Sequence, residues 1–80
     1  MKAKEMFEKL GYKQVGAYTK ISEILRYKKD YDNIIVFYNF KEFMKKGEDS
    51  ESYSNFTLEE LKAINKQIEE LGWNKWDLNI

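Results

Sequence analysis

The sequence predicts an α+β domain in which two helices cover one face of an antiparallel sheet. Near both ends of the chain, apolar residues recur every three or four positions, as they do along one side of a helix. In the middle of the chain, the period falls to two, which is typical of strands. The order helix, strands, helix favours a meander of three or four strands with both helices on one face.

The first predicted helix is short and lies at the N-terminus. Gly11 suits the left-handed position that follows many helices, and Tyr12 is then placed to cover Phe7. The apolar side of this helix is expected to consist of Ala3, Met6, Phe7 and Leu10.

The second predicted helix is longer and has the clearest boundaries in the chain. Thr57 is expected to accept a hydrogen bond from the amide of Glu60, whose carboxylate returns one to the amide of Thr57, so that the two form a capping box. Gly72 and Trp73 are expected to end the helix in a Schellman motif. Five apolar residues share one side, which we expect to be buried: Leu58, Leu61, Ile64, Ile68 and Leu71.

The strands are predicted from alternation in the middle of the chain. The segment 34–40 is apolar on both of its alternating sides, so it is expected to lie in the centre of the sheet. Flanking strands are predicted over 24–28 and 43–46, and a weaker edge strand over 12–19, which Gly16 interrupts.

Two helices can cover only one face of this sheet, so the apolar side chains on the other face are left without a covering element. If Ile35 and Phe37 face the helices, Val36 and Tyr38 face away, and we place Tyr27 with them; the reverse assignment leaves a similar apolar group uncovered. An exposed apolar patch on a small domain usually marks an interface. Two alternatives stay open for this patch. Either it is an interface, or the C-terminal tail covers part of this face or the seam between the helices. The tail residues that would do so are Trp73, Trp76, Leu78 and Ile80. If the patch is an interface, its predicted residues are Tyr27, Val36, Tyr38 and Trp76.

Length and composition predict one globular domain over residues 1–80. The chain is 42% hydrophobic and 35% charged, a balance that separates it from disordered sequences. Charges are spread through residues 1–10, and the longest apolar run, 34–38, is far too short to span a bilayer. These features lead us to expect a cytoplasmic protein without membrane contact.

The absence of cysteine and histidine removes most catalytic and metal-binding chemistry. No serine has a histidine partner, and no glycine-rich phosphate loop is present. We therefore expect no enzyme, no cofactor, no metal and no small-molecule substrate; a cleft with paired carboxylates of separated pKa would be needed to argue otherwise.

Two acidic segments are better explained as a turn and a loop than as cation sites. The segment 30–33 begins like a calcium loop, but its sixth position is Ile35 rather than Gly and its twelfth is Lys41 rather than Glu. A tight turn is favoured there. The cluster of Glu48, Asp49 and Glu51 is expected to be a solvated loop.

Charge is divided unevenly along a chain whose net charge is zero. Residues 1–46 hold eleven basic and six acidic side chains, whereas residues 47–80 hold three and eight. The basic half is expected to face the chain's own acidic half; the alternative is a nucleic-acid surface, which would need a clearly basic patch. That patch would draw on Lys13, Arg26, Lys28, Lys29, Lys41, Lys45 and Lys46.

Both helical segments also carry a resemblance. Residues 3–12 and 58–73 look like parts of short uncharacterised proteins encoded by phages and prophages of low-GC Gram-positive bacteria, and the abundance of Lys, Asn, Ile and Tyr is as expected from an AT-rich genome. The resemblance implies a bacterial or phage cytoplasmic setting. It implies no activity, catalytic residue or cofactor.

These observations lead to two hypotheses. The first is a small phage or prophage accessory protein that binds a protein partner, or itself, without catalysis. The alternative is a nucleic-acid module in which Tyr27 and Tyr38 stack on bases beside Arg26, Lys28 and Lys45.

Overall fold

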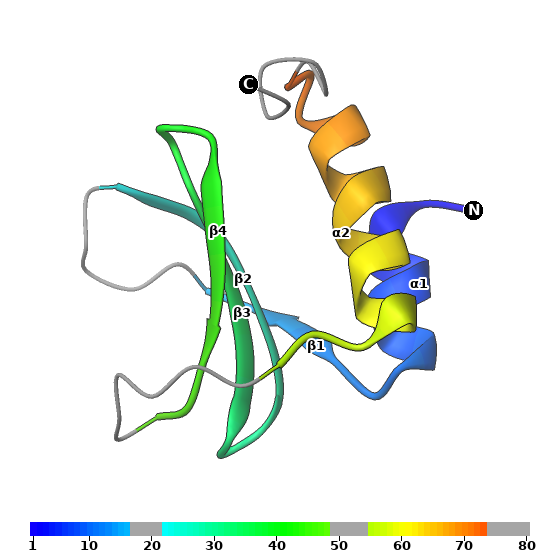
Figure 1. The fold of residues 1–80 in the computed structure, drawn as a ribbon, viewed down its shortest axis with the longest axis vertical. Coiled ribbons are helices and arrows are strands. Elements are labelled where there is room, and N and C mark those ends of the chain that lie inside the picture. Colours follow the sequence, from blue (N-terminus) through cyan, green and yellow to red (C-terminus); the bar gives the residue numbers. More distant parts are fainter. Residues whose placement is uncertain (17–21, 49–54, 74–80) are drawn as a thin grey trace.

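The computed structural model describes residues 1–16, 22–48 and 55–73, which form an antiparallel sheet with both helices on one side of it (Figure 1). This arrangement confirms the predicted fold class. Along the chain the described elements are α1 (Ala3–Lys9), β1 (Lys13–Val15), β2 (Glu23–Asp30), β3 (Asn33–Tyr38), β4 (Glu42–Lys46) and α2 (Leu58–Glu70).

The sheet is a meander in which each strand pairs with the next. The order is β1-β2-β3-β4, and all three pairings are antiparallel. As predicted, the most apolar strand, β3, lies inside the sheet, and its residues from Ile34 to Phe37 have no exposed surface. Of the weak edge strand predicted over 12–19, Lys13–Val15 forms the short β1, and residues 17–19 lie outside the residues that the structure describes.

Strand register decides which side chains face the helices. Tyr27, Ile35 and Lys45 lie opposite one another on β2, β3 and β4 and therefore share the helix-facing side. The far face of the sheet carries the next row along, in which Val36 lies between Arg26 and Met44. The prediction that Tyr27 faces away with Val36 is wrong, because Tyr27 is paired with Ile35, one residue before Val36.

An aromatic core fills the space between the sheet and the helices. The Phe7 ring of α1 stacks on Tyr27 with a centroid distance of 4.0 Å, and it meets Phe37 edge-on at 6.3 Å. Tyr12 meets the edge of Phe7 at 5.8 Å, as the sequence predicts. The buried cluster consists of Phe7, Tyr12, Tyr27, Ile35, Phe37, Ala63, Ile64 and Ile68.

The buried side of α2 differs from the predicted one. Leu58 is 67% exposed and Leu61 is 42% exposed, so the expectation that both are buried is wrong. Two polar residues, Glu60 and Gln67, point into the protein instead, where each accepts a hydrogen bond from a buried tyrosine. These bonds orient α2 so that the first part of its leucine stripe lies at the edge of the contact with the rest of the domain.

The predicted helix ends are confirmed. The Thr57 hydroxyl accepts from the Glu60 amide at 3.0 Å, and the Glu60 carboxylate accepts from the Thr57 amide at 2.9 Å. At the other end Gly72 has a φ of 77°, and the Trp73 amide donates to the Ile68 carbonyl at 3.1 Å. No helix within the described ranges is long and apolar enough to cross a membrane.

Candidate binding surface

The far face of the sheet offers less apolar surface than the sequence predicts. Val36 has no exposed surface, because it lies in a row between the longer side chains of Arg26 and Met44. Tyr38 lies on the same face and is half-buried. Trp76, the fourth predicted interface residue, lies outside the residues that the structure describes. Of the predicted set, Tyr38 is therefore the residue that stays accessible on the described surface.

The residues of the predicted nucleic-acid surface are divided between the two faces. Tyr27 and Lys45 are buried on the helix-facing side, so the proposed grouping with Arg26 and Lys28 is wrong. On the far face, Arg26 Nη2 lies 2.8 Å from Glu23 Oε1 in a largely buried ion pair. Lys28 Nζ lies 2.8 Å from Glu48 Oε2 nearer the surface. Arg26 and Lys28 are thus paired with carboxylates of the chain itself.

A buried network around the Glu60 carboxylate joins β4 to both helical segments. Lys45 Nζ donates to the two Glu60 oxygens at 2.8 and 3.0 Å and to the Asn55 carbonyl at 3.0 Å. The Tyr12 hydroxyl donates to Glu60 Oε2 at 2.6 Å, and the Thr57 amide completes the set. The capping box predicts only the last of these bonds; the inward direction of Lys45 follows from its register opposite Ile35.

The pKa values of Glu60 and Tyr12 are shifted in opposite directions in this network. Burial raises the pKa of the Glu60 carboxyl, but hydrogen bonds from Lys45, Tyr12 and Thr57 outweigh burial, so that its pKa is lowered overall. Burial and the hydrogen bond to Glu60 raise the pKa of Tyr12. An ionised carboxylate whose donors surround it neither takes nor gives a proton near neutral pH, and its role is to hold β4, α2 and Tyr12 together.

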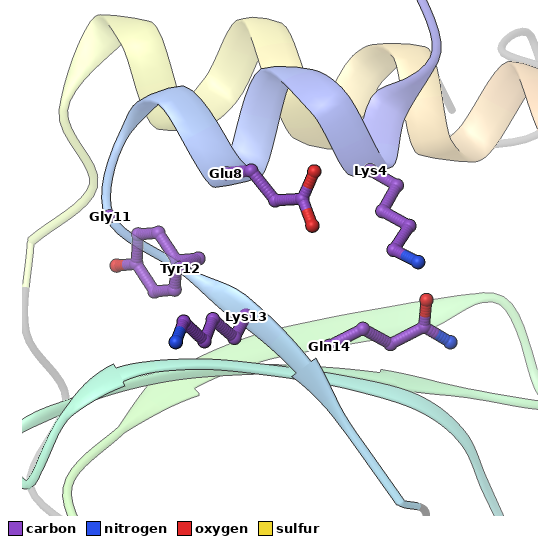
Figure 2. A pocket seen from close by; sticks show the side chains of 6 residues that line it. All are labelled: Lys4, Glu8, Gly11, Tyr12, Lys13 and Gln14. Atoms are coloured by element: carbon purple, nitrogen blue, oxygen red, sulfur yellow. The ribbon is translucent and has the colours of Figure 1, made fainter.

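A shallow hollow of about 390 Å³ lies between α1 and β1 (Figure 2). Lys4 and Glu8 extend from α1 towards the sheet, and Lys13 and Gln14 lie on β1 opposite them. The hydroxyl of Tyr12 is committed to Glu60 and takes no part. Side chains of both charges line the hollow without converging on one point, so it selects no particular ligand.

The acidic segments behave as turns and loops where the structure describes them. Asp30 Oδ1 accepts from the Asp32 amide and from Asn33 Nδ2, both at 2.9 Å, and these bonds lower the Asp30 pKa. The predicted turn is therefore confirmed. Asp49 and Glu51 fall outside the described residues, and within the described ranges no three acidic side chains group together as a metal site would require.

The outer edge of β4 is the candidate binding surface. β4 pairs with β3 on one side, and within the described ranges no backbone hydrogen bond reaches its other side. Phe40, in the turn before β4, is 54% exposed and stacks on Tyr38 with a centroid distance of 5.3 Å. Phe40 therefore adds apolar surface at the start of this strand, whose outer side has no backbone partner among the described residues. Tyr38 lies one strand further in, between Glu23 and Glu42, and does not border this edge. The sequence reveals Phe40 as an aromatic residue, but only the sheet order shows that it precedes an edge strand.

Comparison with protein-family models, with curated proteins and with solved structures finds no match to the chain.

Proposed function

We propose that the chain is a non-enzymatic protein-binding module, a small phage or prophage accessory protein that acts in the cytoplasm. The observation that carries this proposal is the outer edge of β4, which has no backbone partner among the described residues, together with the exposed Phe40 in the turn that leads into β4. An extended segment of a partner that adds to such an edge gains backbone hydrogen bonds, and side-chain contacts supply its specificity.

Apolar surface near this edge supports the proposal. Burial of a phenylalanine side chain contributes about 1.5–3 kcal/mol, and Phe40 exposes more than half of its surface. The absence of His and Cys, together with the closed hydrogen bonding of Glu60, supports binding rather than catalysis.

Site-specific photocrosslinking in the native host tests this function. A photoreactive phenylalanine analogue replaces Phe40 in one variant and the exposed Lys4 of α1 in another. We expect a protein adduct, identified by mass spectrometry, from position 40 and none from position 4. An adduct only from position 4 would move the binding surface to the hollow in Figure 2, and no adduct from either position would contradict the proposal.

The phage or prophage origin is tested by the neighbouring genes. We expect the coding gene to lie within a cassette of phage replication, lysis or regulatory genes. A location among chromosomal housekeeping genes in every host genome would contradict this part of the proposal.

A nucleic-acid module is the second candidate, and one observation favours it. Lys13, Lys28 and Lys46 occupy one row across the far face, together with the buried Ile34. Binding of single-stranded DNA or RNA through this row would fall steeply as salt is added. No retention of either nucleic acid at low ionic strength would remove the candidate, and retention that Lys13→Glu and Lys46→Glu abolish would support it.

A further inference from the structure

We infer that the partner of the β4 edge is a second copy of this chain, paired antiparallel with β4 about a two-fold axis at Met44. This inference rests on the proposed function and names its partner. The two four-stranded sheets would join into one continuous sheet, with the helices of both copies on the same side.

The charges of β4 are complementary to themselves in this register. With Met44 opposite Met44 of the second copy, Glu42 lies opposite Lys46, and Lys46 lies opposite Glu42. Both residues belong to the far face, because Glu42 pairs with Tyr38 and Lys46 with Ile34. Opposite charges directly across a strand pair stabilise it, so the two-fold register brings together two favourable pairs.

Neighbouring registers lose this match. A shift of two residues towards the C-terminus places Lys45 opposite Lys45 and leaves Glu42 without a lysine across the pair. A shift by a single residue turns the far face of one copy to the helix-facing side of the other, and the lysine that it can place opposite Glu42 is Lys45, which is buried and bonded to Glu60. Among the registers that keep both helix layers on one side of the sheet, the charge pattern of β4 favours the one centred on Met44.

The helix layer provides apolar surface beside the same edge. Glu59 lines a hollow with Met6 of α1 and with Leu10, which follows α1, so that flank of α2 faces α1. Leu61 is two positions further along the helix, about 200° around its axis, and thus lies on the flank away from α1. That flank is on the β4 side, because α1 packs next to β1 at the other end of the sheet. A second copy on β4 would cover part of the exposed Leu61.

The other sheet edge lacks these properties. β1 has three residues, and antiparallel self-pairing about Gln14 would place Lys13 opposite Val15. This register has no opposite-charge pair. β1 therefore serves as the internal control for the inference.

Charge reversal on β4 provides the test, with oligomeric state measured by sedimentation equilibrium over a wide concentration range. We expect the wild type to dimerise as concentration rises. Glu42→Lys alone and Lys46→Glu alone each place like charges across the axis twice, so each variant is expected to be monomeric. An equimolar mixture of the two restores opposite charges at both pairs and is expected to form the heterodimer. Lys13→Glu on β1 is the matched control and is expected to dimerise as the wild type does, with circular dichroism used to check that every variant is folded.

Each result supports or overturns the inference. Monomeric single variants whose mixture dimerises support it, because only the proposed register predicts rescue in trans. Single variants that dimerise like the wild type, or a wild type that stays monomeric at millimolar concentration, overturn it. If the wild type stays monomeric, a Phe40 adduct with a different protein would still support the proposed protein-binding function. The absence of any adduct would contradict both the dimer and that function.

Discussion

Lys45 shows how far the environment of one residue depends on its strand partner. In the sequence it is one of two adjacent lysines in a polar segment and resembles a surface cation. In the structure, its side chain is 4% exposed and bonds to the Glu60 carboxylate. Because Lys45 lies opposite Ile35, it points to the helices, whereas the next residue, Lys46, points to the far face. A buried charge with one ionic partner makes the stability of the domain sensitive to either member of the pair.

Removal of the Lys45 charge is expected to destabilise the protein strongly. Lys45→Met keeps much of the side-chain volume but leaves the Glu60 carboxylate buried without its cation, which costs about 3–5 kcal/mol. Urea unfolding followed by circular dichroism measures the loss. The control is Lys62→Met, which removes an exposed partner of Glu59 at 3.6 Å and is expected to change the unfolding free energy by less than about 0.5 kcal/mol. Equal effects of the two substitutions would contradict a structural role for Lys45.

The Glu60 carboxyl is expected to contribute to the pH dependence of stability. Its pKa in the folded protein lies below its ordinary value of 4.5, so between the two values the unfolded chain binds more protons than the folded chain. The contribution is complete above about pH 4.5 and is lost as the pH falls through the lowered folded pKa. Glu60→Gln removes this titration.

Unfolding free energies measured from pH 6 down to pH 3 should therefore fall less steeply in Glu60→Gln than in the wild type, although the variant starts less stable at pH 6. The partly exposed Glu48 also has a lowered pKa, through its bond to Lys28, and Glu48→Gln is the comparison for a surface carboxylate. A slope in Glu60→Gln as steep as that of the wild type would show that Glu60 does not stabilise the folded state in this pH range.

At the level of elements, both helices end in the same backbone geometry. Gly11 and Gly72 have φ values of 94° and 77°, and in each case the next residue donates its amide to the carbonyl five positions earlier. These residues are readable in the sequence because glycine adopts positive φ without the steric cost that other residues carry. The aromatic residue that follows each glycine then packs against the core.

Substitution of Gly72 tests the importance of this ending. Gly72→Ala forces a Cβ atom into the left-handed region and is expected to destabilise the protein by about 1 kcal/mol, although no atom stands in the way of the new methyl group. Gly16→Ala is the matched control, since Gly16 has neither a positive φ nor a close neighbour, and no loss is expected there. Thermal unfolding compares the two. A loss at Gly16 equal to that at Gly72 would rule out backbone conformation as the cause.

Sequence periodicity does not predict which side of α2 faces the core. Apolar spacing places Leu58 and Leu61 on the same side as Ile64, yet the structure leaves both leucines exposed. Periodicity treats Glu60 and Gln67 as surface residues, but each is buried and bonded to a tyrosine. Because hydrogen-bonded polar groups are tolerated in a core, the buried side of a helix is not always its most apolar side.

At the scale of the whole molecule, stability is expected to decrease from the centre of the sheet to the edge at β1. β3 is paired on both sides, and Ile34 to Phe37 are fully buried, whereas β1 has three residues and one neighbour. Amides in a buried, doubly paired strand exchange with solvent only when most of the protein unfolds, while those of a short edge strand exchange through local opening.

Hydrogen exchange measured by NMR is the check on this expectation. Amides of β3 that pair within the sheet should exchange with a free energy close to that of global unfolding. Amides of β1 should exchange with a clearly smaller value. Equal protection of β1 and β3 would show that the domain opens only as a single unit.

The sequence by itself determined the elements, their order and the ends of the helices, but not every strand bound. The strand predicted over 34–40 ends at Tyr38, because residues 39–41 form the turn before β4. Capping at Thr57, termination at Gly72, the turn at Asp30 and the central place of β3 all depend on neighbours a few positions away, and the structure confirms each of them. The apolar side predicted for α1 is the buried one, but the tertiary structure alone decided which side of α2 and of β2 is buried. Strand alternation has a period of two, so a difference of one position puts Tyr27 in the core rather than on the far face, and residue order does not specify that register. The buried Lys45–Glu60 pair and the edge position of β4 in the described sheet both follow from register and strand order, because each depends on contacts between residues distant in the chain.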